Sequence, residues 1–171
     1  MNKMIKIIAM ALLTILANAR AEDFVLAGKK ISLPLPKTWQ AKAPQDNALV
    51  FFDTSKTEPR LVISVYLAPF KYPGNDVSEF EAQYLKNKKE WLLAVNAGAK
   101  HKPEFTYQEK AKSVQISYSF DFNNQSFEEI VKFQDCGDGS AIALKAMIPQ
   151  GEVANQNKAL LSKFFKTQPC P

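Results

Sequence analysis

The stretch Lys112–Ile148, KSVQISYSFDFNNQSFEEIVKFQDCGDGSAIALKAMI, decides the fold of this chain. From Val114 to Phe122 apolar and polar residues alternate without a break, and a period of two is typical of a strand with one buried face. Asn123 and Asn124 follow, and asparagine tolerates the positive φ that a tight hairpin turn requires. The stretch predicts three successive strands at the centre of one antiparallel sheet.

The second of these strands, Ser126–Gln134, alternates less regularly than the first. Glu128 and Glu129 stand together, and Ile130 and Val131 follow them. This pattern leaves two interpretations open: a β-bulge, or a strand that is buried on both faces beyond Glu129.

The other strands are marked by apolar runs between turn residues. Asp135–Gly139 predicts a turn, and Ser140–Ile148 is the third central strand, which Pro149 ends because proline cannot donate to the ladder. The remaining strands are predicted at Phe24–Leu35 (one strand, or a hairpin that turns at Gly28–Lys30), Ala48–Phe52, Leu61–Leu67 and Phe105–Glu109.

Two amphipathic helices complete the pattern. Apolar residues recur at three- and four-residue spacing over Val77–Ala97 and again over Glu152–Lys166, so each helix has one face for packing on the sheet. Ser78 with Glu81, or Asp76 with Glu79, would form a capping box at the start of the first helix, and Gly98 would end it.

The first 21 residues have the composition of a secretory signal peptide. Lys3 and Lys6 precede an apolar run, Ile7–Ala17, and Ala19-Arg20-Ala21 offers small residues before a cut after Ala21. The run is short for a membrane anchor, which is the alternative. Residues 22–171 then form a single domain, which is periplasmic or secreted.

Removal of the signal peptide would lower the net charge of the protein. The whole chain has 22 basic and 17 acidic residues and a net charge of +5. Residues 1–21 hold three of the basic residues and none of the acidic ones, so the domain that remains carries only +2. This balance gives no support for binding nucleic acid.

The two cysteines, Cys136 and Cys170, predict a disulfide bond. An even pair in an exported chain is most simply a disulfide, and the spacing lacks the Cys-x-x-Cys pattern of a redox site. The bond would tie a strand end to the residues that follow the last helix.

No motif in the chain predicts a catalytic or metal site. His101 is the only histidine and lies in a polar connection, so a histidine-pair zinc site is excluded. Asp135–Ser140 lacks the further acidic ligands of a calcium loop. Glu128 and Glu129 would point to opposite faces of a strand, so we expect a solvated segment or a bulge there and not an acid–base pair.

Two groups of residues are candidates for a partner surface. Phe70 and Tyr72 sit in a loop, where they either pack over the sheet or are exposed for recognition. Lysines gather near the end of the first helix, where they form either a solvated face or a docking patch for an acidic partner or anionic lipid. These lysines are Lys86, Lys88, Lys89, Lys100 and Lys102.

The order of elements and two local motifs resemble the Mog1/PsbP-like superfamily, which includes DcrB-like periplasmic proteins. The motifs are Ile31–Trp39, a strand that runs into proline and then tryptophan, and Gly139–Ile148 leading into the terminal helix. The resemblance implies an α+β fold, an antiparallel sheet of about six or seven strands with two main helices packed on it. Members are accessory or protein-binding modules without a shared catalytic site, and the Cys136/Cys170 pair is not part of their pattern.

The sequence therefore favours a non-enzymatic, exported accessory protein of the bacterial cell envelope that binds a protein partner and needs no cofactor. One alternative is an envelope hydrolase whose carboxylates come from distant residues and form no motif. Another is a carrier of a small apolar ligand, which would need an internal cavity.

Overall fold

The three central strands form the middle of the structure, a computed structural model that describes residues 20–26, 28–45, 48–58 and 60–170. They are β8 (Ser113–Phe122), β9 (Gln125–Asp135) and β10 (Ala141–Pro149), and each is antiparallel to the next. Asn123 and Asn124 turn between β8 and β9 with φ of 50° and 60°. The predicted hairpin turn is confirmed.

Five further strands extend this meander on both sides. In the described part of the chain the sheet has eight strands in the order β3-β4-β5-β10-β9-β8-β6, with β7 also paired to β8, and all its pairs are antiparallel. The added strands are β3 (Trp39–Gln45), β4 (Ala48–Asp53), β5 (Val62–Leu67), β6 (Gly98–Ala99) and β7 (Glu104–Gln108).

The edge strand β3 was not predicted from the sequence. Its register shifts between Lys42 and Gln45, an interval that contains Pro44, which has no N–H to donate. A strand of this kind is tolerated at a sheet edge because only one side of it must pair. The first two strands, β1 (Arg20–Leu26) and β2 (Lys29–Leu35), form a separate hairpin, as one of the two alternatives for this segment predicted.

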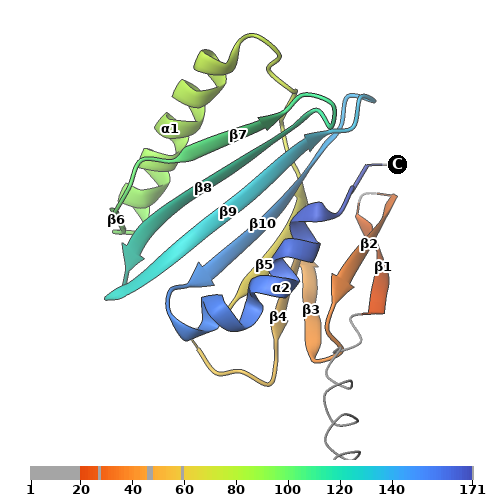
Figure 1. Cartoon of the computed structure of the whole chain (residues 1–171), viewed down its shortest axis with the longest axis vertical. Helices are drawn as coiled ribbons and strands as arrows, with labels where there is room; N and C mark the ends of the chain where they lie inside the picture. The colour runs from red at the N-terminus through yellow and green to blue at the C-terminus, as the bar shows by residue number, and fades with distance from the viewer. Residues whose placement is uncertain (1–19, 27, 46–47, 59, 171) are drawn as a thin grey trace, which may run out of the picture.

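The two helices cover opposite faces of the sheet (Figure 1). α2 (Glu152–Lys166) and the hairpin β1–β2 lie on one face, where Phe164 and Leu33 join the largest core cluster. α1 (Val77–Ala94) lies on the other face, over a cluster of aromatic side chains. The predicted α+β class, with a helix-covered antiparallel sheet, is confirmed.

α1 begins at Val77 as predicted, but the predictions for its caps were wrong. Asp76 is the N-cap residue but makes no side-chain capping hydrogen bond, so neither predicted capping box forms. Glu81 instead accepts a hydrogen bond from the Tyr107 hydroxyl at 3.0 Å. At the other end the helix stops at Ala94, Asn96 takes the left-handed conformation with φ of 53°, and Gly98 belongs to β6.

The C-terminal end of α2 is attached to β9 by several bonds. The predicted disulfide between Cys136 and Cys170 is present, with Cα atoms 5.2 Å apart. Lys132 donates to the carbonyl oxygens of Phe165 and Thr167, both at 3.2 Å. These carbonyls end the helix and lack partners within it, so a cation is well placed there.

We expect the disulfide to stabilise the fold without being essential for it, because Lys132 also holds the end of α2. The cross-linked residues are 34 apart in sequence, so replacing Cys170 by serine should lower the free energy of unfolding by about 3–4 kcal/mol. Urea unfolding with and without reductant measures this difference. In reductant the unaltered protein and Cys170→Ser should unfold alike, and equal stability without reductant would contradict the prediction.

Candidate functional site

A buried ionic network lies between α1 and the centre of the sheet. Glu129 on β9 is 2% exposed, and Lys88 Nζ of α1 lies 2.6 Å from its Oε1. Lys145 Nζ of β10 lies 2.7 Å from Oε2, as an ion pair without the geometry of a hydrogen bond. A carboxylate is costly to remove from water unless it is paired, so these two lysines are what allows Glu129 to be buried.

Aromatic rings surround the network. Lys88 Nζ lies 4.6 Å from the ring centre of Tyr118 and 4.7 Å from that of Trp91. Lys145 Nζ lies 5.8 Å from the Trp91 ring centre. Such contacts attract a cation to the negative face of the ring, and more strongly where water is excluded. The rings therefore compensate the two lysines for part of their lost hydration.

Burial also shifts the acidity of the groups around Glu129. It raises the pKa of Tyr66 to about 12, and the charge of Glu129 acts in the same direction. The same two causes raise the pKa of Tyr84 and Tyr118 far above the ordinary value. Burial lowers the pKa of Lys88, although Glu129 opposes that shift. At neutral pH the three tyrosine hydroxyls are therefore hydrogen-bond donors.

The expectation that Glu128 and Glu129 form a solvated segment or a bulge was wrong for Glu129. β9 keeps one continuous register with β8 and with β10, so no bulge occurs, and Glu129 is buried. The strand is buried on both faces beyond Glu129, which was the other interpretation. The sequence indicated the two partners of Glu129, since Lys88 interrupts the apolar stripe of α1 and Lys145 interrupts the apolar strand β10.

Beside the network is a basic pocket of about 400 Å³. It lies between the second half of α1 and the connection that leads from β6 to β7, and Tyr118 of β8 lines it. Four of the five lysines predicted as a docking patch meet there, while Lys86 is exposed on α1 and does not line it. The lining residues are Leu85, Lys88, Lys89, Leu92, Ala99, Lys100, His101, Lys102, Pro103 and Tyr118.

An aromatic pocket of about 370 Å³ also borders Lys88. Phe70 lines it and is half-buried, stacked on Phe133 at 5.4 Å and edge-on to Phe80 at 5.5 Å between ring centres. The other lining residues are Tyr66, Ala68, Pro69, Gln83, Tyr84, Asn87, Lys88 and Trp91.

Tyr72 does not line either of these pockets. Its N–H donates to Asp135 Oδ2 at 2.9 Å, and Lys112 Nζ lies 5.2 Å from its ring centre. Tyr72 and Phe70 are both half-buried and packed with the aromatic cluster under α1. Of the two readings for these aromatics, the structure therefore shows packing, and Phe70 is the one that also borders a cavity.

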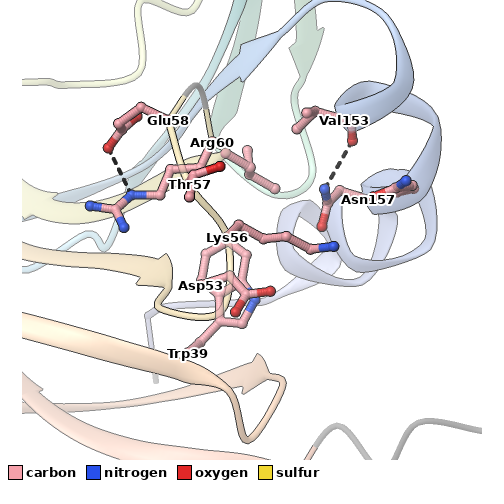
Figure 2. Close-up of a pocket in the computed structure, with 10 residues that line it drawn as sticks. Trp39, Asp53, Lys56, Thr57, Glu58, Arg60, Val153 and Asn157 are labelled. Carbon is pink, nitrogen blue, oxygen red and sulfur yellow. Dashed lines mark hydrogen bonds and ion pairs between the residues drawn. The ribbon is translucent and has the colours of Figure 1, made fainter.

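A third pocket, of about 520 Å³, lies on the other face of the sheet, between the start of α2 and the segment that joins β4 to β5 (Figure 2). Its polar groups largely bond to their own neighbours. Arg60 Nε pairs with Glu58 Oε1 at 2.9 Å, and the Asn157 amide donates to the Val153 carbonyl at 2.9 Å. Asp53 accepts hydrogen bonds from Ser55. The described side chains here balance their charges, and no sequence pattern pointed to this pocket.

The remaining candidates for chemistry have structural partners or lie at the surface. Asp138 pairs with Lys29 at 2.6 Å, and that contact, together with Ser140, lowers the pKa of its carboxyl. Asp135 accepts the N–H groups of Tyr72 and Gly137. His101 is exposed. Within the described residues no group of three or more His, Cys, Asp and Glu side chains is placed to hold a metal ion.

Comparison with known proteins identifies the fold. No family model matches the chain, and no curated protein matches it. It is similar to the structure of PA94, a protein of unknown function from Pseudomonas aeruginosa, with 12% identity, a TM-score of 0.52 and coverage of 86% of this chain and 94% of the other.

Two further solved structures are similar over most of their length. The Saccharomyces cerevisiae Ran-binding protein Mog1p has 12% identity and a TM-score of 0.50, and the match covers 86% of this chain and 94% of that one. Cyanobacterial PsbP from Synechocystis has 12% identity and a TM-score of 0.50, with coverage of 93% and 97%. At this identity the likeness concerns the fold alone, which is Mog1/PsbP-like.

We expect replacement of Glu129 by glutamine to destabilise the protein strongly. The change keeps the shape of the side chain but leaves the half-buried Lys88 and Lys145 without a counter-charge, and breaking a buried ion pair typically costs about 3–5 kcal/mol. Glu128→Gln is the matched control, because the adjacent side chain is only half-buried and should change stability by less than about 0.5 kcal/mol. Urea unfolding monitored by circular dichroism compares the two variants, and similar losses would contradict the role of the network.

Alkaline pH tests the tyrosines around the network. The pKa of Tyr66 is raised to about 12, whereas a tyrosine in the unfolded chain has a pKa of about 10. A raised pKa contributes stability that is present below about pH 10 and is lost as pH rises toward the folded value. The lowered pKa of Lys88 makes the free energy of unfolding rise with pH, but only below about pH 10.4, where lysine in the unfolded chain is still charged. The measurement is therefore made above that pH.

Above about pH 10.4 we expect the free energy of unfolding to fall as pH rises, with a smaller slope in Tyr66→Phe. Circular dichroism follows unfolding while ultraviolet absorbance follows tyrosinate. Ionisation of all five tyrosines in a chain that keeps its folded spectrum would show that the rings are not buried as described.

Proposed function

We propose that the chain is an exported, non-enzymatic accessory protein of the bacterial cell envelope that binds a protein partner through the α1 face. The main observation behind this proposal is the two pockets that Lys88 borders, which lie beside the ion pairs of Glu129 with Lys88 and Lys145. A protein of the same fold, Mog1p, is described as Ran-binding, which supports a binding role for such a sheet and helix.

Export is supported by the sequence of residues 1–21 and by the disulfide. Residues 1–19 lie outside the described part of the chain. Cleavage after Ala21 would leave Glu22–Leu26 paired with β2, and Phe24 would keep its contact with Phe51 at 4.8 Å between ring centres. Disulfides persist in oxidising compartments, which fits a periplasmic or secreted domain of residues 22–171. In the described part of the chain, no helix combines the length and apolar character needed to cross a membrane.

The proposed partner surface differs in detail from the one read from sequence. Lys86, Lys89, Lys100 and Lys102 are exposed, whereas Lys88 lies deeper and is committed to Glu129. Phe70 contributes through the wall of the aromatic pocket, and Tyr72 contributes by holding the loop in place through its N–H. The surface is therefore the pocket-bearing face of α1 together with the Lys100–Pro103 connection.

A second candidate function is the carriage of a small apolar ligand, which the aromatic lining of the pocket beside Phe70 favours. Native mass spectrometry of protein purified from its source would reveal such a ligand. For the envelope hydrolase the described carboxylates offer less support. Glu129 is held by two lysines, and Asp135 is held by backbone N–H groups.

Photo-crosslinking in the source cells tests the binding role. A photoreactive amino acid is placed at Asn87, which is exposed at the rim of the aromatic pocket, and as a control at Lys158, which is exposed on α2. We expect one specific protein adduct from position 87 and none from position 158. Cell fractionation and the N-terminal mass of the chain, expected to begin at Glu22, test export. Equal adducts from both positions, or none, would contradict the proposal.

A further inference from the structure

The basic pocket gathers positive charge from two separate segments. Lys88 and Lys89 come from α1, whereas Lys100, His101 and Lys102 come from the connection between β6 and β7. Among the described residues that line the pocket none is acidic. Clefts lined by one sign of charge concentrate the opposite charge, so the pocket attracts anions.

Only part of this charge is neutralised inside the protein. Lys88 pairs with Glu129, and Lys100 pairs with Asp121 at 3.1 Å and donates to Ser126 Oγ at 2.6 Å. Lys89 and Lys102 are exposed, and neither forms an ion pair with a carboxylate of the described chain. Two cations at the rim are therefore available to a ligand.

The rest of the wall is apolar. Leu85 and Leu92 of α1 and Pro103 present hydrocarbon beside the lysines. The pocket thus offers hydrogen-bond donors and cations around an apolar floor. Its complement is an anion with several acceptor oxygens joined to a compact apolar group.

We propose that the basic pocket binds an acidic peptide segment of the partner protein, with carboxylates at Lys89 and Lys102 and an apolar side chain over Leu85, Leu92 and Pro103. This inference rests on the proposed function, because it takes the partner to be a protein. A membrane surface would fit less well. The exposed large hydrophobic residues of the described chain, Val25, Leu93 and Phe122, lie on three separate elements and form no apolar belt beside the lysines.

Fluorescence anisotropy with labelled peptides tests the pocket in the purified, disulfide-bonded protein. The probe is a short peptide in which glutamates flank one leucine, and two matched peptides replace the glutamates by glutamine or the leucine by serine. We expect the first peptide to bind at least about tenfold more tightly than either matched peptide, with an affinity that falls as salt rises.

Two protein variants locate the binding. Lys89→Glu with Lys102→Glu should weaken binding of the acidic peptide by about tenfold or more. Lys110→Glu with Lys158→Glu makes the same change in net charge at exposed lysines outside the pocket, and should leave binding nearly unchanged. Equal effects of the two double variants would overturn the proposal.

Two further results distinguish this inference from the proposed function. The protein could bind phosphatidylglycerol vesicles and not the acidic peptide, and the Lys89/Lys102 double variant could lose that vesicle binding. This result would overturn the peptide assignment in favour of lipid. If the crosslink at position 87 persists in that double variant and the peptide does not bind, the inference is wrong and the proposed function stands. If no specific crosslink forms at position 87, the proposed function is wrong whatever the peptides show.

Discussion

The charge of Glu129 is the constraint on which the α1 side of the molecule depends. The carboxylate lies inside the protein, on a central strand, where an uncompensated charge would cost several kcal/mol. One of its counter-charges, Lys145, comes from the neighbouring strand, but the other comes from a helix more than forty residues earlier in the chain. α1 is therefore attached to the sheet at a fixed point as well as by apolar contact.

The fixed point also shapes the cavities. Lys88 must reach Glu129, and its side chain enters between the rings of Tyr118 and Trp91. Lys88 lines a pocket on each side of its side chain. One pocket becomes basic because the connection after β6 brings further lysines, whereas the other is lined by aromatic rings from β5, β9, α1 and the loop before α1. The two differ in chemistry although they share one lysine.

Local patterns in the sequence were enough to predict most of the fold. The strand at Val114–Phe122, its turn at Asn123 and the span of α2 follow from alternation, turn chemistry and helical spacing, which are properties of neighbouring residues. β3 was missed because an edge strand needs pairing on only one side and so shows a weaker pattern. The capping boxes predicted for α1 were wrong for another reason, since a contact across the fold engages Glu81 with Tyr107 of β7.

The candidate site could be predicted only in part. The sequence indicated that lysines gather near the end of α1, and four of them do line one pocket. It could not indicate that Lys88 is drawn inward or that Glu129 is buried, because both depend on the side chains that face them across α1, β9 and β10. The available signals were Lys88 within the apolar stripe of α1 and Lys145 within the apolar strand β10. They indicate a buried ion pair only when the carboxylate that lies between them, Glu129, is known.

The position of β10 in the sheet has a consequence for how the chain acquires its structure. β5 pairs with β4 on one side and with β10 on the other, and Val62 meets Met147 across that second pairing. During folding, β5 therefore has an unpaired edge until β10 joins it, and closing so long a loop is slow. The strands before β5 can pair earlier, because β1 with β2, β3 with β4, and β4 with β5 are all neighbours in sequence. The eight-stranded sheet becomes continuous only when β10 takes its place between β5 and β9, and the disulfide to Cys170 can then tie the segment after α2 to the end of β9.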